Sequence, residues 1–163
     1  MLLPVYYQNG QHYILFTRRT ELVHHHKGEI SFPGGGYHPD DSTLLNTALR
    51  ESYEEIGLGP ADVEVLGELD DTVTKGSNYI ITPFIGFIKP DYQFIPSNFE
   101  IAEIISIPIA ALLGEGCRRE DPVLILSGRP FIPYIYTYQN KMIIGATARI
   151  LKQFLDFFSQ VNQ

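Results

Sequence analysis

The feature that most constrains this chain is a group of three glutamates, Glu51, Glu54 and Glu55, in the last turn of a predicted helix that stops at Gly57. At about 3.6 residues per turn, these positions project from one side of the helix. Their charges repel one another, and the C-terminal end of a helix is also the negative pole of its dipole. Only Arg50 is close enough in sequence to offset them. The arrangement predicts a bound cation, because hard divalent ions such as Mg²⁺ prefer clustered carboxylate oxygens.

The alternative is a solvated acidic face with no ligand, which is the ordinary meaning of a charge run. The upstream sequence favours the metal site. Phe32-Pro33-Gly34-Gly35-Gly36 is followed by Asp40-Asp41-Ser42, an acidic entry suited to N-capping the helix. A glycine-rich turn lets backbone carbonyls and amides approach a metal or a phosphate without an intervening Cβ. Loop and helix together form one strand–loop–helix unit.

The run from Gly35 to Leu58, GGYHPDDSTLLNTALRESYEEIGL, resembles the Nudix box, whose ending Arg-Glu-x-x-Glu-Glu-x-Gly-aliphatic is matched from Arg50 onward. A chain of 163 residues predicts one domain, residues 1–163. The resemblance makes it a Nudix hydrolase domain and implies an α/β/α sandwich fold with a central mixed β-sheet. It also implies metal-dependent cleavage of a diphosphate joined to another moiety. The ordinary box has a glutamate where Ser42 stands here. The glycine-to-arginine spacing is one residue longer than usual, which puts Asp41 near the missing acid.

A second set of residues resembles the coenzyme A pyrophosphatase branch of the Nudix hydrolases. It consists of Leu15-Phe16-Thr17-Arg18-Arg19, then Val23, and the run from His26 to Gly35. Ala48-Leu49 fits that branch, and so does the closing segment Gly145 to Leu151. Three positions depart from the branch pattern: Ser42, His24 and Ile144.

The resemblance assigns the metal ligands and their support. Glu51 and Glu55 are expected to bind Mg²⁺ or Mn²⁺ directly, with the main-chain carbonyl of Gly35 as a further ligand. Glu54 is expected to bind through water or to serve a second ion. Arg50 is expected to pair with one of these glutamates and fix its rotamer, a kind of support that tunes metal sites strongly.

The proton acceptor for the attacking water is expected outside the box. Glu103 and, close behind it, Glu100 are the candidates, in a segment similar to one of the coenzyme A branch. A general base must come within hydrogen-bond reach of the water, which sequence does not show. The alternative is that both are exposed loop acids.

The basic side chains near the glycine turn are the substrate-binding candidates: Arg18, Arg19, His26 and Lys27. Arginine suits this role because its planar fork matches phosphate geometry. The alternative is that these cations only balance the nearby carboxylates. A zinc site at His24-His25-His26 is not expected, because adjacent residues on an extended segment point to alternate faces.

Composition excludes other classes of function. The formal net charge of −7 argues against a nucleic-acid or membrane-surface binder, although metal ions can make a phosphate site locally positive. The single cysteine, Cys117, excludes an internal disulfide and fits a reducing cytoplasm. We find neither a signal-peptide pattern nor a membrane-length apolar run, so a cytoplasmic protein is expected.

The chain shows α/β order. The predicted strands are residues 2–8 and 12–17 around an Asn9-Gly10 turn, 63–74 and 78–89 around a turn at residues 75–77, and 131–138. The predicted helices are 42–56, with a buried stripe at Leu45, Ala48, Leu49, Ser52 and Ile56, a short one from Pro108 to Leu113, and 146–158.

The interpretation is a cytoplasmic Nudix pyrophosphohydrolase that splits coenzyme A or its derivatives into 3′,5′-ADP and (acyl-)4′-phosphopantetheine. Two alternatives stay open. One is a Nudix hydrolase of another nucleoside diphosphate derivative, such as ADP-ribose or a dinucleotide. The other is a ligand-binding Nudix domain without catalysis, against which the intact run from Arg50 to Glu55 argues. A small-molecule nucleotide is the expected partner, and the sequence leaves open whether the chain forms a homodimer.

Overall fold

The Asn9-Gly10 turn produces the hairpin that the sequence predicts. In the computed structural model, both turn residues have positive φ, 50° and 82°, as a tight hairpin turn requires. Strand β1 (Leu2–Gln8) pairs with β2 (Gln11–Arg19) in antiparallel register, with Val5 opposite Ile14. The structure describes residues 1–22, 27–74, 79–126, 129–131 and 133–161.

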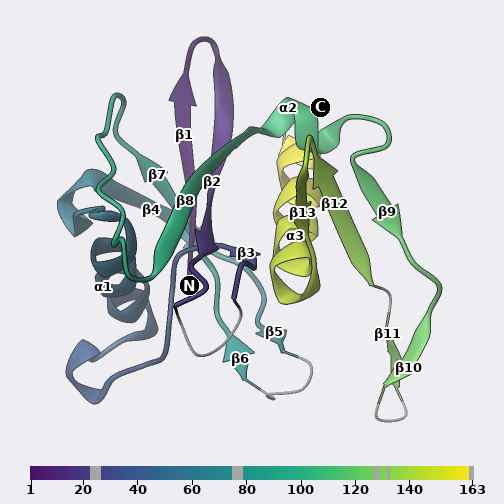
Figure 1. The fold of residues 1–163 in the computed structure, drawn as a ribbon, viewed down its shortest axis with the longest axis horizontal. Coiled ribbons are helices and arrows are strands. Elements are labelled where there is room, and N and C mark those ends of the chain that lie inside the picture. The colour runs from purple at the N-terminus through teal and green to yellow at the C-terminus, as the bar shows by residue number, and fades with distance from the viewer. Residues whose placement is uncertain (23–26, 75–78, 127–128, 132, 162–163) are drawn as a thin grey trace.

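This hairpin forms the centre of a six-stranded mixed sheet (Figure 1). Strand β1 pairs in parallel with β7, and the other pairs of this sheet are antiparallel. The order is β3-β2-β1-β7-β4, with β8 also paired to β2. The further strands are β3 (Ile30–Ser31), β4 (Val63–Glu68), β7 (Phe84–Ile88) and β8 (Ile101–Pro108).

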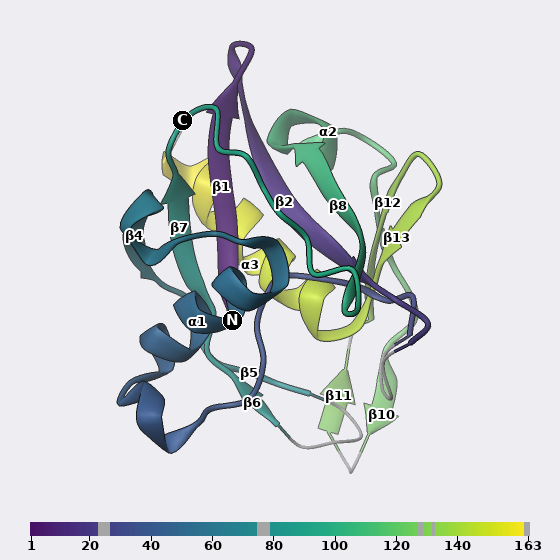
Figure 2. The same cartoon turned by 60° about the vertical axis from the view of Figure 1, so that its left-hand side comes forward.

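The two long helices, α1 (Leu44–Ile56) and α3 (Gly145–Val161), cover opposite faces of this sheet (Figures 1 and 2). Side chains alternate between the faces along each strand. Leu15 of β2 packs in the cluster that contains Ala48 of α1, whereas its neighbour Phe16 packs in the cluster that contains Leu151 of α3. The predicted α/β/α sandwich with a mixed sheet is confirmed.

Helix α1 ends where the sequence predicts but begins two residues later than predicted. Thr43, not the acidic run before it, caps the N-terminus, and its side chain accepts a hydrogen bond from the Asn46 amide. At the other end Gly57 takes the left-handed conformation, with φ of 70°. The predicted stripe lies on the buried side, and Ser52 is fully buried because its hydroxyl donates to the Ala48 carbonyl.

Two predicted strands are divided in the structure, and a third begins later than predicted. The first, 63–74, is divided into β4 and β5 (Thr72–Val73), and 78–89 is divided into β6 (Ile80–Ile81) and β7. Strand β5 pairs with β6 outside the central sheet. The predicted turn at 75–77 lies outside the described residues. Pro133, which has no N–H to donate, precedes β12 (Tyr134–Tyr138), so the predicted strand 131–138 begins later.

The remaining elements form a smaller layer beside α3. The predicted short helix is α2 (Ile109–Leu113). Strands β9 (Arg118–Glu120), β12 and β13 (Lys141–Ile143) form a three-stranded antiparallel sheet. Strands β10 (Leu124–Leu126) and β11 (Arg129–Phe131) form a separate pair. Among the described helices, none has the length and apolar character needed to span a membrane.

Leu151 tests the core between α3 and the sheet, because its side chain is fully buried in that cluster. We expect Leu151→Ala to lower the free energy of unfolding by about 2–5 kcal/mol, because truncation loses buried surface and leaves a cavity. Leu113→Ala on half-exposed α2 is the matched control and should cost much less. Urea unfolding followed by circular dichroism measures both, and equal losses would contradict this packing.

Candidate functional site

The glycine turn packs directly against two of the three glutamates of α1. The Gly34 amide donates a hydrogen bond to Oε2 of Glu55 at 3.3 Å. A Cβ placed on Gly35 would lie 2.4 Å from a carboxylate oxygen of Glu51, a separation that real Cβ atoms do not show. A Cβ at position 35 would push the Glu51 carboxylate away, so the glycine allows the contact between the turn and the acidic helix end that the sequence predicts.

Burial sets the electrostatics of these carboxylates. The Glu55 side chain is 3% exposed, and desolvation raises its pKa to about 8. Arg19 and the Gly34 amide oppose that rise, while the charges of Glu51 and Glu100 add to it. Desolvation also raises the pKa of Glu51. Both carboxylates thus lack sufficient compensating positive charge within the chain itself.

A divalent ion fits this deficit. Among the described residues, three acidic, histidine or cysteine side chains do not converge on one point as a ready-made metal cage. Mg²⁺ does not need such a cage, because it keeps several waters and is held by one or two carboxylates. Glu51, Glu55 and the backbone carbonyl of Gly35 are the residues that would hold it.

Arg50 fixes the acidic end of the helix through Asp41. Its Nε and Nη2 donate to the two oxygens of Asp41 at 2.7 and 3.0 Å. Asp41 also accepts from the Thr47 hydroxyl at 2.8 Å and from the His38 amide at 3.0 Å. These bonds, that of Arg50 first, hold the pKa of Asp41 well below its usual range. The buried Asp41 therefore acts as the partner of Arg50, in agreement with its expected place near the missing box acid.

The other nitrogens of Arg50 reach the glutamates and the loop. Nη1 donates to Glu51 at 2.8 Å and to Glu54 at 3.0 Å, and Nη2 donates to the Gly36 carbonyl at 3.2 Å. The predicted pairing of Arg50 with a glutamate is therefore present. Glu54 is half exposed and turned toward Arg50, so its predicted role at a second ion stays a prediction.

The two candidate general bases lie in different surroundings. Arg19 bridges Glu55, at 3.4 Å, and Glu100, at 3.7 Å, so Glu100 belongs to the carboxylate group. Glu103 instead accepts from Arg18 at 3.0 Å and from Lys141 at 2.5 and 2.6 Å, and these bonds lower its pKa. A carboxylate held by two cations is a poor proton acceptor, so this geometry favours Glu100 as the base.

These two acids separate because Glu100 lies in the turn before β8, whereas Glu103 lies within β8. Glu103 shares a face of β8 with Ile105, which packs in the cluster below α3, whereas Arg19 shares a face of β2 with Leu15 on the α1 side. The register between β2 and β8 also shifts between Arg18 and Arg19. Sequence spacing alone did not reveal this shift.

The predicted substrate-binding cations divide in the same way. Arg19 lies among the carboxylates, and its buried Nε has no hydrogen-bond partner within the described part of the chain. Arg18 lies on the opposite face with Glu103. Lys27 is exposed in a turn. His26 lies outside the described residues, as do His24 and His25.

A segment that no sequence motif marks, residues 92–97, packs against the C-terminal end of α1. The Tyr92 hydroxyl donates to the Gly57 carbonyl at 2.5 Å and accepts from the Gly59 amide at 3.0 Å. The Ile95 amide donates to the Ile56 carbonyl, and the Ser97 amide donates to the Glu55 carbonyl. These donors satisfy carbonyls at the negative pole of the helix. A tyrosine 35 residues after Gly57 carries no local signal for this role.

The glutamates, the glycine turn and their order in the chain agree with a family model described as the NUDIX domain, which matches residues 2–124. The chain belongs to the Nudix family. Two relatives named "Uncharacterized Nudix hydrolase NudL", from Photorhabdus laumondii subsp. laumondii and Yersinia pestis, are each 34% identical to it. The alignments cover 86% and 85% of this chain and 74% and 69% of the relatives.

Solved Nudix structures share the fold. A MutT/nudix family protein from Enterococcus faecalis has a TM-score of 0.65 at 16% identity, over 97% of this chain and 60% of that one. An Ap4A hydrolase of C. elegans, solved as a binary complex, has a TM-score of 0.58 at 13% identity, over 67% and 78%. The NUDIX domain of Shewanella oneidensis NrtR, complexed with ADP ribose, has a TM-score of 0.52 at 18% identity, over 69% and 72%.

Membership confirms the predicted family and enzyme class, since Nudix hydrolases act on pyrophosphate bonds. They generally use divalent ions such as Mg²⁺ or Mn²⁺. The likeness to the solved structures shows the fold of this Nudix protein.

Asp41→Asn tests the support of Arg50. The asparagine keeps the shape but loses the charge that holds the guanidinium, so Glu51 loses its fixed rotamer. We expect metal-dependent turnover to fall about 10–100-fold. Asp40→Asn is the matched control, because that side chain is 92% exposed. Initial rates at saturating Mg²⁺ measure both variants, and an Asp41→Asn protein as active as its parent would contradict this role.

Glu55 also predicts how stability of the metal-free protein changes with pH. Its folded pKa, about 8, lies above the ordinary value of 4.5, so its contribution is present below pH 4.5 and is lost as the pH rises through 8. Glu55→Gln stays neutral. We expect it to match the parent at low pH and to exceed it by about 5 kcal/mol above pH 8. Thermal unfolding in EDTA measures this, and a parent that is the more stable at pH 9 would refute the assignment.

Proposed function

We propose that this Nudix hydrolase splits the diphosphate of coenzyme A or its derivatives, giving 3′,5′-ADP and (acyl-)4′-phosphopantetheine, with Mg²⁺ or Mn²⁺. The observation that carries the hydrolase part is the packing of the Gly34-Gly35 turn against Glu51 and Glu55. The resemblance of Leu15 to Arg19 and of the run ending at Gly35 to the coenzyme A branch supports the substrate.

Each of these residues has a separate role in the proposed hydrolysis. Glu51, Glu55 and the Gly35 carbonyl hold the ion, and Arg50 keeps Glu51 in place. When bound, a divalent ion polarises phosphoryl oxygens and lowers the pKa of a bound water. Glu100 accepts the proton of the attacking water. The water oxygen then bonds to one phosphorus, and the bridging P–O bond breaks to leave the second product as a phosphate.

The positive charge of Arg19 partly balances the carboxylates of Glu55 and Glu100. Arg19 contacts Glu55 and Glu100 together, so it holds the proton acceptor beside the carboxylate that binds the ion. Its guanidinium also lowers the repulsion between these two acids, which otherwise raises the pKa of Glu55. We expect Arg19 to position Glu100 as well as to meet a substrate phosphate.

The decisive experiment is a substrate panel with two glutamine variants. Purified protein is incubated with Mg²⁺ and coenzyme A, ADP-ribose or NADH, and products are separated by chromatography with mass detection. We expect 3′,5′-ADP and 4′-phosphopantetheine from coenzyme A. Glu55→Gln should lower turnover by orders of magnitude, while Glu64→Gln, an exposed glutamate of β4, should leave it unchanged.

The outcomes separate the alternatives. Turnover of ADP-ribose or NADH without turnover of coenzyme A would reassign the substrate and leave the hydrolase chemistry standing. Ligand binding without turnover of any compound would indicate a binding domain. Unaltered activity of Glu55→Gln would remove Glu55 from the reaction.

A further inference from the structure

Three charged side chains from separate strands meet on the α3 side of the sheet. Arg18 of β2 donates through Nε to Glu103 of β8 at 3.0 Å. Lys141 of β13 donates to both oxygens of the same carboxylate, at 2.5 and 2.6 Å. One carboxylate thus orients two cations, and the group carries one net positive charge in a chain whose net charge is −7.

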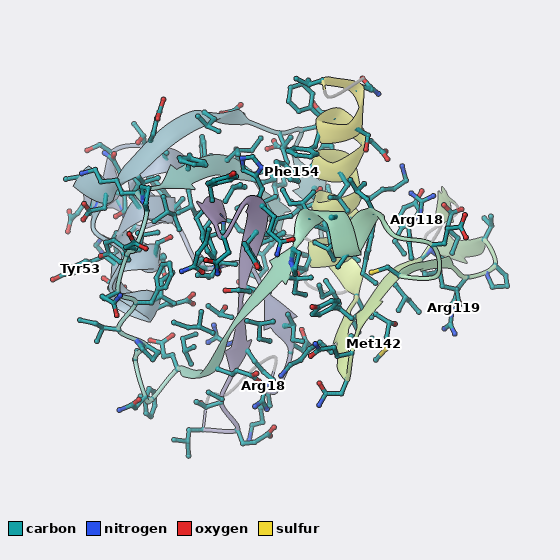
Figure 3. The ribbon with its side chains drawn as sticks, turned by 90° about the horizontal axis from the view of Figure 1, so that it is seen from above. Arg18, Tyr53, Arg118, Arg119, Met142 and Phe154 are labelled. Atoms are coloured by element: carbon teal, nitrogen blue, oxygen red, sulfur yellow. The ribbon has the colours of Figure 1, made fainter. Side chains whose placement is uncertain are left out.

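The strand faces turn these side chains toward one another. Lys141 shares a face of β13 with Ile143, which is buried below α3, whereas Met142 between them is exposed. Arg18 likewise shares a face of β2 with buried Phe16. Figure 3 labels Arg18 at the end of β2 and Met142 on β13. The group therefore forms the polar end of the core between α3 and the central sheet.

This group is connected to the proposed metal-binding carboxylates through the neighbouring residues Arg18 and Arg19. Arg18 precedes Arg19, whose guanidinium contacts Glu55. Because neighbouring residues on a strand point to opposite faces, the two arginines reach the two sides of the sheet from one point. Strand β2 ends at Arg19, so a ligand whose diphosphate lies at Glu51 and Glu55 would reach Arg18 by passing around this strand end.

From this geometry we infer that Arg18 and Lys141, oriented by Glu103, bind a phosphate monoester that the substrate carries in addition to its diphosphate. The inference rests on the proposed function and narrows its substrate class. A phosphate monoester carries close to two negative charges at neutral pH and has three acceptor oxygens. An arginine fork beside a lysine point charge matches that group. The 3′-phosphate of coenzyme A is such a group, and ADP-ribose has none.

A purely structural role explains the arrangement less well. The Arg18 side chain is 42% exposed and that of Lys141 is 19% exposed, so both can reach a ligand. Ion pairs with this exposure add little to stability. Within the described part of the chain, Glu103 is the one acidic side chain in contact with either cation. The cations are thus oriented by a single carboxylate and keep a positive balance.

Binding of product-like nucleotides tests the inference without hydrolysis. Isothermal titration compares 3′,5′-ADP with 5′-AMP, which differ by the 3′-phosphate alone. We expect the parent to bind 3′,5′-ADP at least about 10-fold more tightly, because charge-assisted contacts are the strong ones. Lys141→Met should remove most of this preference, and Lys141→Arg should keep it. Lys89→Met, which removes an exposed lysine paired with Asp62, is the control and should behave as the parent.

Kinetics provide the second readout. With coenzyme A and 3′-dephospho-coenzyme A as substrates, we expect Lys141→Met to lower the ratio of their kcat/KM values about 10–100-fold. Equal losses on both substrates, or a nucleotide preference that survives Lys141→Met, would overturn the inference and leave the proposed function intact. If neither coenzyme is hydrolysed, the proposed function fails, and the nucleotide comparison still decides the inference.

Discussion

The structure of this Nudix protein depends on the close approach of a glycine turn to two acidic side chains at the end of α1. Gly35 lies so near the Glu51 carboxylate that a Cβ there would displace it, and the Gly34 amide donates to buried Glu55. The surrounding contacts support this packing. Asp41 holds Arg50 beside Glu51, and Arg19 lies between Glu55 and Glu100. The amides of residues 95 and 97 donate to the last helical carbonyls. The chain thereby keeps a concentrated negative charge that a divalent cation can complete.

Most of the fold was predictable because its signals are local. The Asn9-Gly10 turn identified the first hairpin, and Gly57 identified the end of α1. The predicted boundaries of helices and strands were wrong where residues distant in sequence determine the structure. Thr43 caps α1 because Asp41 instead binds Arg50 and Thr47. The predicted strand 63–74 is divided because β4 pairs in the central sheet, whereas β5 pairs with β6 outside it. Propensity and alternation contain no information on such competition between partners.

The site was likewise predictable only where its residues lie close together in the sequence. Glu51, Glu55, Arg50 and Gly35 lie within one short motif, and their predicted proximity is present in the structure. Sequence spacing could not show which of Glu100 and Glu103 is the better candidate base. A register shift between β2 and β8 at Arg18 and Arg19 determines which cations each acid contacts. Lys141, which contacts Glu103 from 38 residues away, reaches that carboxylate only because β13 turns it inward beside Ile143. Tertiary placement, not residue type, makes it a candidate ligand for phosphate.

The most direct test of the central claim is paramagnetic broadening by Mn²⁺ in a two-dimensional amide spectrum of the nitrogen-15-labelled protein. Substoichiometric Mn²⁺ should selectively broaden the amide signals of Gly34, Gly35 and the last turn of α1, and Glu51→Gln should abolish the effect. The signals of β9 should stay sharp. Broadening centred elsewhere, or none at the glycine turn, would contradict the assignment of Glu51 and Glu55 as the metal ligands.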